Sequence, residues 1–375
     1  MTFRLAFRNL SHDRVRLVVT LTGIVFAVVL ITIQFGLFLG FTRTICDVID
    51  HTRADIWITP RGVANYEQSF VMNDRWLYQA LSTPGVTGAE KLVTQFANWQ
   101  KPSGGKQIIL IVGSELHTGT LTPWNFVRGG PQGLAVVNTV TVDQLYLAKL
   151  GIHGVGDTVE INGHRARVVG VTDGIRSFTT SPFVFTSLKN SLDYAGLDEN
   201  EMNYLLVHTA SGVPVEQVKN SLQARMPEVD VYTKAEFRDK TRRSWIYDTG
   251  AGAGFLTAAA LGLVVGIVVV TQTLYASTID HLNEYATLRA MGSANSFLYR
   301  IIILQAVMSA VAGYAIGLAI SLGIERLSQS GVTVILVSKE LAAALLGVTV
   351  LMCVMAAITS IRKVTRVEPA MVFKG

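Results

Sequence analysis

Residues 249–279 read TGAGAGFLTAAALGLVVGIVVVTQTLYASTI, a run of 31 positions without Asp, Glu, Lys or Arg. A helix needs about 20 predominantly apolar residues to cross a hydrocarbon core of roughly 30 Å. Three more uncharged runs reach that length, at residues 17–42, 301–324 and 341–361. These four runs predict four transmembrane helices.

The composition of the whole chain agrees with this prediction. Of its 375 residues, 50% are apolar and only 16% are charged, and the mean hydropathy is +0.39. A soluble domain carries about 25% charged residues. Residues 43–248 contain no apolar run of comparable length, so they predict a folded domain inserted between the first and second transmembrane helices.

The net charge of +5 is concentrated beside the predicted spans. Residues 1–42 carry four basic and one acidic side chain, residues 249–375 carry eight and five, and residues 43–248 carry 20 and 21. Lys and Arg accumulate in the cytoplasmic flanks of membrane helices. The high pI near 9.2 therefore indicates the orientation of the chain in the membrane rather than a nucleic-acid-binding surface. The predicted sides are cytoplasmic for residues 1–16, 280–300 and 362–375, and external for residues 43–248 and 325–340.

The amino-terminal segment is expected first to lie on the membrane and then to cross it. Phe3, Phe7 and Leu10 recur at helical spacing opposite Arg4 and Arg8, which predicts an amphipathic helix on the inner surface. The alternative is that these residues only flank the first span. That span has 26 uncharged residues, which exceeds a signal-peptide core of about 7 to 15 residues, and no small-residue cleavage site follows it. We therefore expect it to be retained.

Inside residues 43–248 the local patterns alternate between strands and helices. The clearest is Asn162-Gly163, a pair typical of tight hairpin turns. The predicted strands cover residues 54–59, 108–112, 135–137, 158–161, 165–171, 183–186, 203–208 and 230–232. The predicted helices cover residues 74–81, 142–150, 215–225 and 234–247. The predicted fold class is thus an α-helical membrane protein with four transmembrane helices and a large extracytoplasmic α+β domain of two lobes, the second inserted in the first.

The sequence lacks the motifs that would indicate catalysis or cofactor binding. No G-x-x-x-x-G-K-[ST] loop occurs, since Gly104-Gly105-Lys106 lacks both the leading glycine and the following hydroxyl. Neither a G-x-S-x-G nucleophile motif nor an H-x-x-x-H or C-x-x-C metal pair is present. No Asp, Glu, Lys or Arg lies within a predicted span, which disfavours a proton-coupled transporter. We therefore expect this chain to have no enzyme activity, no catalytic or metal-binding residues and no bound cofactor.

The loop between the second and third predicted spans has the pattern of an amphipathic helix. Its apolar residues share one helical face, charged residues flank that face, and a glycine follows as a natural helix end. From this pattern alone, an interfacial linker helix is the alternative. The residues concerned are Leu282, Glu284, Tyr285, Leu288, Arg289, Met291 and Gly292.

Residues 284–292, EYATLRAMG, closely resemble the E-x-x-x-L-R-A-x-G coupling-helix signature of FtsX-like permeases, the membrane subunits of MacB-type (type VII) ABC systems. Residues 4–10 resemble the family's amino-terminal surface helix, residues 147–171 its MacB-like periplasmic core domain, and residues 367–370 its carboxyl-terminal tail. Residues 54–62, together with the absence of a fused nucleotide-binding domain, look closest to the DevC branch. His281 and Asn283 depart from residues common in relatives, which leaves open how the ATPase would dock.

The resemblance implies a permease subunit of an ABC exporter. Such a subunit couples cytoplasmic ATP hydrolysis by a separate ATPase to extracytoplasmic movement, or mechanotransmission, and to export of a hydrophobic or amphipathic cargo. The implied partners are a dimer of ABC ATPase subunits that hold ATP and Mg²⁺, a second copy of the chain, a periplasmic adaptor, an outer-membrane channel and membrane lipid. The implied location is the bacterial inner membrane. The alternative is a non-transporting, FtsX-type sensor that regulates a periplasmic partner.

Small residues suggest where the spans bend and pack. A 31-residue helix rises about 46 Å, more than the hydrocarbon core requires, and Gly250, Gly252 and Gly254 would allow a hinge at its start. The alternative is that these glycines only permit close helix packing. Pairs of small residues four apart predict further close contacts between spans. They are Gly36 with Gly40, Ala258 with Gly262 and Gly266, and Gly313 with Gly317.

Overall fold

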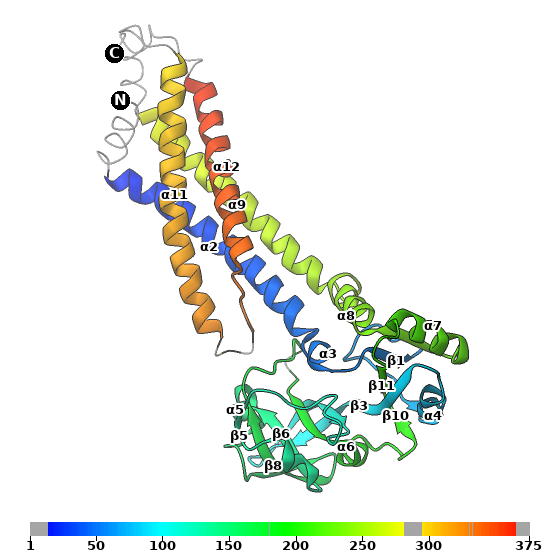
Figure 1. Cartoon of the computed structure of the whole chain (residues 1–375). Coiled ribbons are helices and arrows are strands. Elements are labelled where there is room, and N and C mark those ends of the chain that lie inside the picture. Colours follow the sequence, from blue (N-terminus) through cyan, green and yellow to red (C-terminus); the bar gives the residue numbers. More distant parts are fainter. Residues whose placement is uncertain (1–13, 180, 281–294, 330, 332, 365–375) are drawn as a thin grey trace, which may run out of the picture. The chain divides into compact units, whose positions relative to one another are not determined.

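The structure is a computed structural model that describes residues 14–179, 181–280, 295–329, 331 and 333–364 (Figure 1). The chain divides into two compact units. The helical unit comprises residues 1–40, 253–329 and 334–375, and the α+β unit comprises residues 41–252 and 330–333. The predicted amphipathic helix before residue 14 and the tail after residue 364 lie outside the described residues.

The helical unit contains the four predicted spans as long helices. They are α2 (Arg14–Thr44), α9 (Ala251–Asp280), α11 (Asn295–Ser328) and α12 (Lys339–Val364). Each is long and apolar enough to cross a membrane, so the predicted fold class of four membrane helices and an α+β domain is confirmed. Helix α11 extends beyond the predicted residues 301–324 at both ends, because backbone hydrogen bonding continues past the point where charged residues begin.

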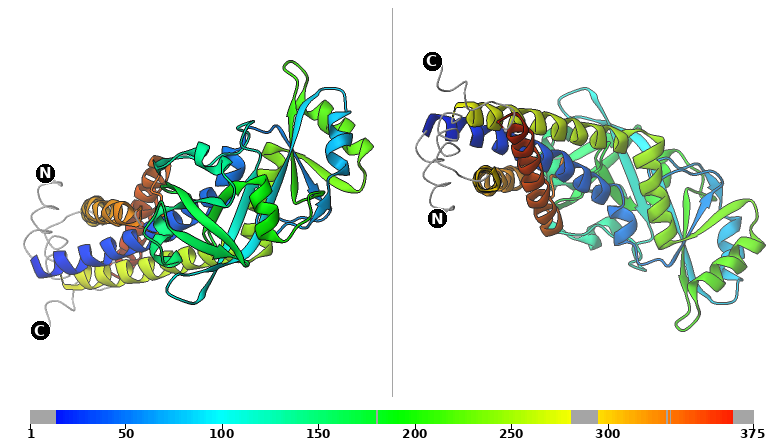
Figure 2. Two further views of the ribbon diagram at one scale, coloured as in Figure 1. Left: turned by 90° about the horizontal axis from the view of Figure 1, so that it is seen from below. Right: turned by 90° about the horizontal axis from the view of Figure 1, so that it is seen from above.

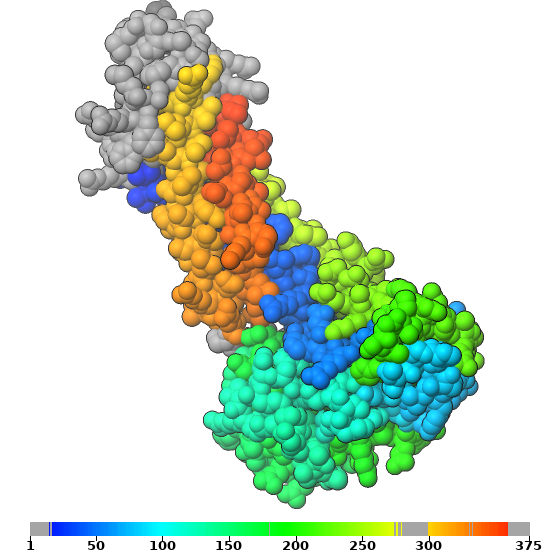
Figure 3. Space-filling model, in the orientation of Figure 1, coloured from blue at the N-terminus to red at the C-terminus, as the bar shows by residue number. Residues whose placement is uncertain are grey.

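Glycines bring the helices of this unit close together. Gly313 and Gly317 of α11 lie against α2, where an added Cβ would come within 2.5 Å of Ile24 and 2.8 Å of Val28. On α9, an added Cβ at Gly262 would come within 2.0 Å of another α2 side chain. Helices α2 (blue) and α9 (yellow-green) accordingly run side by side in Figures 1 and 2, and α11 and α12 lie together in Figure 3.

Gly36 and Gly40 were predicted to pack against another helix. In the structure they pack instead against residues 334–336, which are not helical. The Leu336 amide donates to the Gly36 carbonyl oxygen at 3.0 Å. A Cβ added at Gly40 would lie 1.9 Å from the Val334 carbonyl oxygen. Because glycine has no side chain, Gly36 and Gly40 allow the backbone of residues 334–336 to approach α2 closely. A second helix would need the same free space.

The α+β unit is built on a ten-stranded sheet and a two-stranded sheet. The order of the large sheet is β12-β1-β11-β3-β4-β9-β6-β8-β5, and β7 pairs with both β3 and β8. Strands β3, β4, β9, β6, β8 and β7 thus pair in a closed ring, which we call the barrel lobe. Strands β12, β1 and β11 with the start of β3 form the open lobe.

The strands have the following bounds: β1 (Ile56–Pro60), β2 (Met72–Asn73), β3 (Val86–Gln100), β4 (Lys106–Ser114), β5 (Phe126–Arg128), β6 (Thr139–Asp143), β7 (Thr158–Ile161), β8 (His164–Thr172), β9 (Phe183–Ser187), β10 (Glu201–Met202), β11 (Tyr204–Thr209) and β12 (Val229–Thr233). The helices are α3 (Asp47–His51), α4 (Arg75–Leu81), α5 (Leu147–Leu150), α6 (Leu188–Ala195), α7 (Val215–Arg225) and α8 (Lys234–Arg243). Short 3₁₀ turns occur at η1 (Pro131–Ala135) and η2 (Gln144–Tyr146), and a π-helical turn occurs at η3 (Ser244–Asp248).

The two predicted lobes are present, but they share strand β3. Its first part, residues 86–92, pairs with β11 of the open lobe, and residues 92–100 pair with β4 of the barrel lobe. Strand β4 is buried on both faces, with Ile109 and Ile111 in one core cluster and Leu110 in another. One continuous sheet therefore joins the lobes, and the barrel lobe is inserted in the sequence of the open lobe.

Two predicted elements are wrong. The strand expected at residues 135–137 begins only at Thr139, after the 3₁₀ turn η1 and a left-handed residue, Asn138 (φ 60°). The helix expected at residues 142–150 is a strand up to Asp143, whose carboxylate then caps η2 by accepting from the Leu145 amide at 3.0 Å. By contrast, the hairpin at Asn162-Gly163 is confirmed, with φ of 47° and 87°.

Candidate functional site

The predicted ATPase-coupling residues lie outside the described part of the chain. They are Leu282, Glu284, Tyr285, Leu288, Arg289, Met291 and Gly292, all within residues 281–294. Their role stays a prediction from sequence. The described residues do contain the segments that connect the long helices α2 and α9 to the α+β unit, and these segments form the candidate site.

The three predicted hinge positions differ in whether the local structure requires glycine. Gly250 has φ of 73°, in the left-handed region that favours glycine, and lies one residue before α9 begins. A Cβ added at Gly252 would come within 2.7 Å of the backbone of Ile246. Gly254 has nothing within 4 Å of an added Cβ. The first two positions therefore need glycine for local backbone reasons, and the third does not.

The helix predicted over residues 234–247 changes its winding before it reaches α9. Helix α8 ends at Arg243 and continues as the π-helical turn η3, in which the Thr249 amide donates to the Ser244 carbonyl oxygen at 3.2 Å. A π-helical turn followed by a left-handed glycine interrupts the regular hydrogen-bond ladder. The boundary between the two units follows directly, between Gly252 and Ala253. The hinge at these glycines stays a prediction.

We expect Gly250→Ala and Gly254→Ala to have opposite effects. The first forces an alanine into the left-handed region at about 1 to 2 kcal/mol, and the second adds a better helix former, worth up to about 1 kcal/mol. Thermal unfolding of the full-length chain in detergent and hydrogen exchange over residues 244–256 would measure both. Equal effects of the two substitutions would contradict a special role for the Gly250 backbone.

Helix α8 is fastened to α3, the short helix that follows α2 in sequence. The Lys234 ammonium donates to the carbonyl oxygens of Asp50 at 2.9 Å and of Thr52 at 2.6 Å, at the end of α3 where the helix dipole favours a cation. Arg238 Nε lies 3.2 Å from a carboxylate oxygen of Asp50, and the Cys46 thiol donates to the Arg238 carbonyl oxygen at 3.6 Å. We call this set of contacts the α3–α8 clamp.

The electrostatics of the clamp suit a structural role. Burial, with a smaller contribution from the nearby Asp50 carboxylate, raises the pKa of the Cys46 thiol to about 12. The thiol is therefore neutral, acts as a weak donor and is unreactive toward oxidants. Helix α8 also has a complete capping box, in which the Thr233 hydroxyl accepts from the Glu236 amide and the Glu236 carboxylate accepts from the Thr233 amide.

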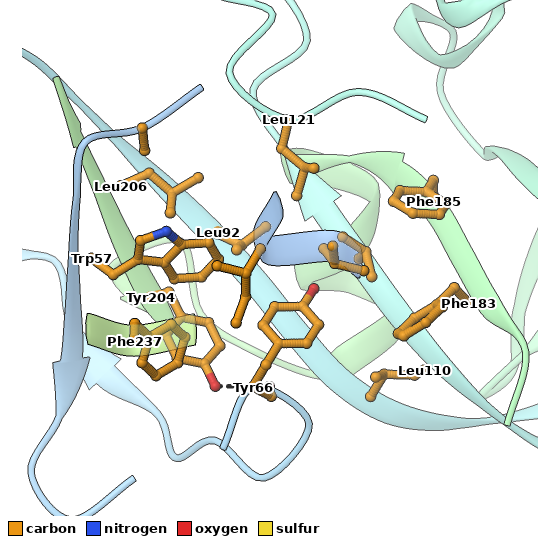
Figure 4. Packing of buried hydrophobic residues seen from close by; sticks show 14 of the residues in the cluster. Trp57, Tyr66, Leu92, Leu110, Leu121, Phe183, Phe185, Tyr204, Leu206 and Phe237 are labelled. Carbon is orange, nitrogen blue, oxygen red and sulfur yellow. Dashed lines mark hydrogen bonds between the residues drawn. The ribbon is translucent and has the colours of Figure 1, made fainter. Parts of the chain in front are cut away.

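Helix α8 packs through Phe237 on a cluster of aromatic side chains. Phe237 of α8 stacks on Trp57 of β1 with ring centroids 5.0 Å apart, and Trp57 meets Tyr66 and Tyr204 edge-on at 6.0 and 5.5 Å (Figure 4). The Tyr204 hydroxyl donates to the Tyr66 carbonyl oxygen at 2.8 Å. All four side chains are at most 1% exposed. Helix α8, which carries Lys234 and Arg238 of the clamp, therefore packs on a buried aromatic cluster.

The described residues offer little that would hold a metal or a reacting substrate. They contain no group of three or more His, Cys, Asp or Glu placed to bind a metal ion. A cavity of about 670 Å³ lies between residues 62–64 and α8, with Glu236, Lys240 and Arg243 in its lining. Since these charges have both signs, the lining does not select one class of ligand.

Sequence reasoning missed the clamp and most of its support. The Thr233-x-x-Glu236 spacing is a capping-box pattern and could have placed the start of α8. Nothing local to Lys234 or Arg238 points to Asp50, which lies more than 180 positions earlier. Such a contact depends on the sheet order β12-β1, which brings the end of β12 beside the start of β1.

Comparison with known protein families agrees with this architecture. Residues 17–225, more than half of the chain, match the family model of the MacB-like periplasmic core domain. Residues 256–369 match the family model of the FtsX-like permease carboxyl-terminal region. Together the two matches cover the first long helix with most of the α+β unit and then the remaining three long helices.

Curated relatives and solved structures are also similar. An uncharacterised ABC transporter permease of Mycobacterium tuberculosis is 22% identical over 382 residues, covering 99% of both chains. One from Methanocaldococcus jannaschii is 19% identical over 338 residues, covering 84% of this chain and 82% of the relative. The crystal structure of the periplasmic region of MacB from Actinobacillus actinomycetemcomitans covers 51% of this chain and 94% of its own, with 10% identity and a TM-score of 0.38.

The architecture of four apolar helices with an α+β domain after the first is thus accompanied by matches to both regions that define one family. The relatives that align over nearly the whole chain carry the same description, ABC transporter permease. The chain belongs to the MacB- and FtsX-like family of ABC transporter permeases.

Proposed function

We propose that the chain is a mechanotransmission permease of an ABC exporter, in which movement of α2 and α9 is passed to the α+β unit. The observation that carries this proposal is the α3–α8 clamp. Helix α2 leads into α3, and α8 leads through η3 into α9. Since Lys234 and Arg238 tie α8 to the end of α3, a shift of either long helix would act on one shared element.

The energy is proposed to come from a separate cytoplasmic ABC ATPase. An ABC permease works with an ATPase, and this sequence has no phosphate-binding loop of its own. ATP and Mg²⁺ would be held by the ATPase, and residues 282–292 would form the contact with it. We further propose the DevC branch, two copies of the permease, a periplasmic adaptor with an outer-membrane channel, and a hydrophobic or amphipathic cargo.

The test is the recovery of partners from membranes. The full-length chain, solubilised in detergent and purified, should bring down an ABC ATPase that mass spectrometry identifies, and ATP hydrolysis should follow the ATPase and not the permease. Hydrolysis that stays with the isolated permease through further purification would overturn the proposal. Recovery of a cell-wall hydrolase together with the ATPase, and without an adaptor, would favour the FtsX-type regulator over an exporter.

The orientation is proposed from the charge distribution, with both termini in the cytoplasm of a bacterial inner membrane and the α+β unit in the periplasm. In a chain with Cys46 and Cys353 replaced by serine, a cysteine at Asn220, on the exposed surface of α7, should react with an impermeant thiol reagent in cells with a permeabilised outer membrane. A cysteine at Ser293 should react only after the inner membrane is opened. Labelling of position 293 under the first condition would contradict this topology.

A further inference from the structure

The loop that follows β8, residues 173–179, connects the barrel lobe with the ends of the long helices. The Phe178 ring meets Phe41, in the last turn of α2, with centroids 4.4 Å apart and planes at 62°. It also meets Trp245, in the π-helical turn η3, at 5.4 Å and 77°. Phe41 and Trp245 meet each other at 6.3 Å and 88°. Edge-on contacts of this kind are favourable for aromatic rings, so Phe178 completes a three-ring cluster.

A buried carboxylate anchors the same loop. Glu67, in the connection after β1, is 5% exposed and accepts hydrogen bonds from the Ser177 hydroxyl at 3.3 Å and the Thr179 hydroxyl at 3.0 Å. The Ser177 amide donates to the Tyr146 hydroxyl at 3.1 Å. A buried carboxylate is costly unless its oxygens are hydrogen-bonded, so undocking of the loop would expose or orphan Glu67.

The loop also touches the third segment that enters the α+β unit. Arg176 Nε donates to the Gly331 carbonyl oxygen at 3.1 Å, within the connection between α11 and α12. The chain passes between the units beside Phe41, after Gly252 and around residues 330–333. The loop therefore has a contact on each of these three connections, at Phe41, Trp245 and Gly331.

We propose that residues 176–179 are the positioning element that links the barrel lobe to the ends of α2 and α8, with Phe178 as the contact and Glu67 as the anchor. This inference rests on the proposed mechanotransmission and names the route by which motion would reach the barrel lobe. Phe178 shares its ring contacts between two connections that are about 200 residues apart in sequence. A change in the spacing of those connections must move the loop or break the cluster.

The Glu67 carboxyl is expected to gain or lose its proton near pH 6. Burial raises the pKa of Glu67 to about 6, although hydrogen bonds from Thr179 and Ser177 lower it. Because undocking would hydrate the carboxyl and restore an ordinary, lower pKa, the docked loop binds the proton more tightly. Docking is therefore favoured as pH falls through about 6 and weakened above it. The other ionisable groups near Glu67 or the loop include Tyr66, Tyr204, Tyr146, Asp143, Arg176, Asp47, which interacts with Arg176, and Asp173 in the loop itself.

Of these neighbours, the three tyrosines stay neutral throughout the range from pH 5 to 7.5. Burial raises the pKa of Tyr146 to about 12 and moves those of Tyr66 and Tyr204 in the same direction. Burial also raises the pKa of Asp143, which accepts hydrogen bonds from the Ile175 and Leu145 amides. Asp143 lies on the β6 side of the loop, so an isosteric Asp143→Asn variant separates its titration from that of Glu67.

Hydrogen exchange of the full-length chain in lipid nanodiscs tests the link. Phe178→Ala should raise exchange about tenfold in residues 41–52 and 244–250 as well as in the loop, while α7 keeps its protection and reports an intact fold. Phe96→Ala, which removes an aromatic ring that is 43% exposed on β3, is the matched control and should leave both helix ends unchanged. A change confined to residues 173–179 would overturn the proposal, because the loop would then be only a lid on its own lobe.

A second comparison tests the anchor. Glu67→Gln imitates the protonated carboxyl, so it should slow exchange in the loop at pH 7.5 and abolish the difference between pH 5 and 7.5 that remains after correction for intrinsic rates. Glu90→Gln is the matched control, since Glu90 is 6% exposed and, like Glu67, accepts from two hydroxyls, here those of Thr118 and Thr120. A pH difference that persists in Glu67→Gln and vanishes in Asp143→Asn would overturn the role of Glu67.

These measurements separate this inference from the proposed function. They use the permease without its ATPase, so they give an answer whether or not the ATPase is recovered from membranes. Failure to recover an ATPase with the wild-type chain counts against the proposed function. Exchange that does not spread from the loop to residues 41–52 and 244–250, in a chain that does recover the ATPase, counts against the loop alone.

Discussion

Replacing Trp57 by alanine is expected to destabilise the α+β unit by about 3 to 5 kcal/mol, the usual range for removing a large buried aromatic side chain. Trp57 is fully buried and contacts Tyr66, Tyr204 and Phe237 from three different segments (Figure 4). Its removal would leave a cavity beneath α8, where the α3–α8 clamp is seated. A loss of this size is a large part of the stability of a typical domain.

Trp57→Phe is the matched control. The indole Nε1 of Trp57 is buried and has no hydrogen-bond acceptor among the described residues, so phenylalanine keeps the aromatic packing and loses no hydrogen bond. We expect a cost of about 1 to 2 kcal/mol from the smaller ring. Proteolysis of the full-length chain in increasing urea, followed through fragments of β1, β11 and β12, would measure both variants. Equal destabilisation by alanine and phenylalanine would contradict the packing argument.

The long helices could be predicted because their cause is local. A continuous uncharged run as long as residues 249–279 is expected to cross a membrane as a helix, since a helix satisfies all its backbone groups within the segment. The hairpin at residues 158–171 was equally local, because Asn162-Gly163 supplies two residues that tolerate positive φ. In both cases the deciding residues are neighbours in sequence.

The missed elements depend on residues that are distant in sequence. Strand β3 carries Glu90 and Lys91 in its middle, which does not suggest a buried strand. Glu90 is nevertheless buried, because the Thr118 and Thr120 hydroxyls donate to its carboxylate at 2.6 Å. Lys91 is held by the Asp74 carboxylate at 2.6 Å. Partners that are distant in sequence allow charged residues to be buried in a strand. The hydrophobic pattern of a short stretch of sequence does not reveal such partners.

The candidate site shows the same division. The glycines at positions 250, 252 and 254 could be singled out because glycine before a long helix is itself informative, but only the surrounding atoms show that Gly254 differs from the other two. Phe178 and Glu67 have no local pattern that marks them. Phe178 belongs to a cluster with Phe41 and Trp245, and these three residues come from segments that are far apart in sequence.

Leu288→Asp is expected to abolish most of the recovery of the ATPase with the permease. Leu288 lies outside the described residues, so the reasoning is from the sequence. If residues 284–292 dock in a groove of the ATPase, the apolar stripe supplies the anchors, and buried anchors dominate such interfaces. An aspartate in that stripe must be desolvated without a partner. We expect the complex to weaken more than about tenfold, which requires only about 1.4 kcal/mol.

The effect must be separated from a general effect of charge or of misinsertion. Ser293→Asp places the same charge in the same loop beyond the resembling motif, and Leu288→Met keeps an apolar side chain of similar volume, so both should recover the ATPase normally. Arg289→Ala should weaken recovery less than Leu288→Asp if Arg289 lies on the rim, where charges mainly tune association, and comparably if it is buried against an ATPase carboxylate. Each yield is normalised to permease in the membrane. Undiminished recovery with Leu288→Asp would mean that residues 281–294 are only a linker. The coupling of ATP hydrolysis to α9 would then have to use another contact with the ATPase.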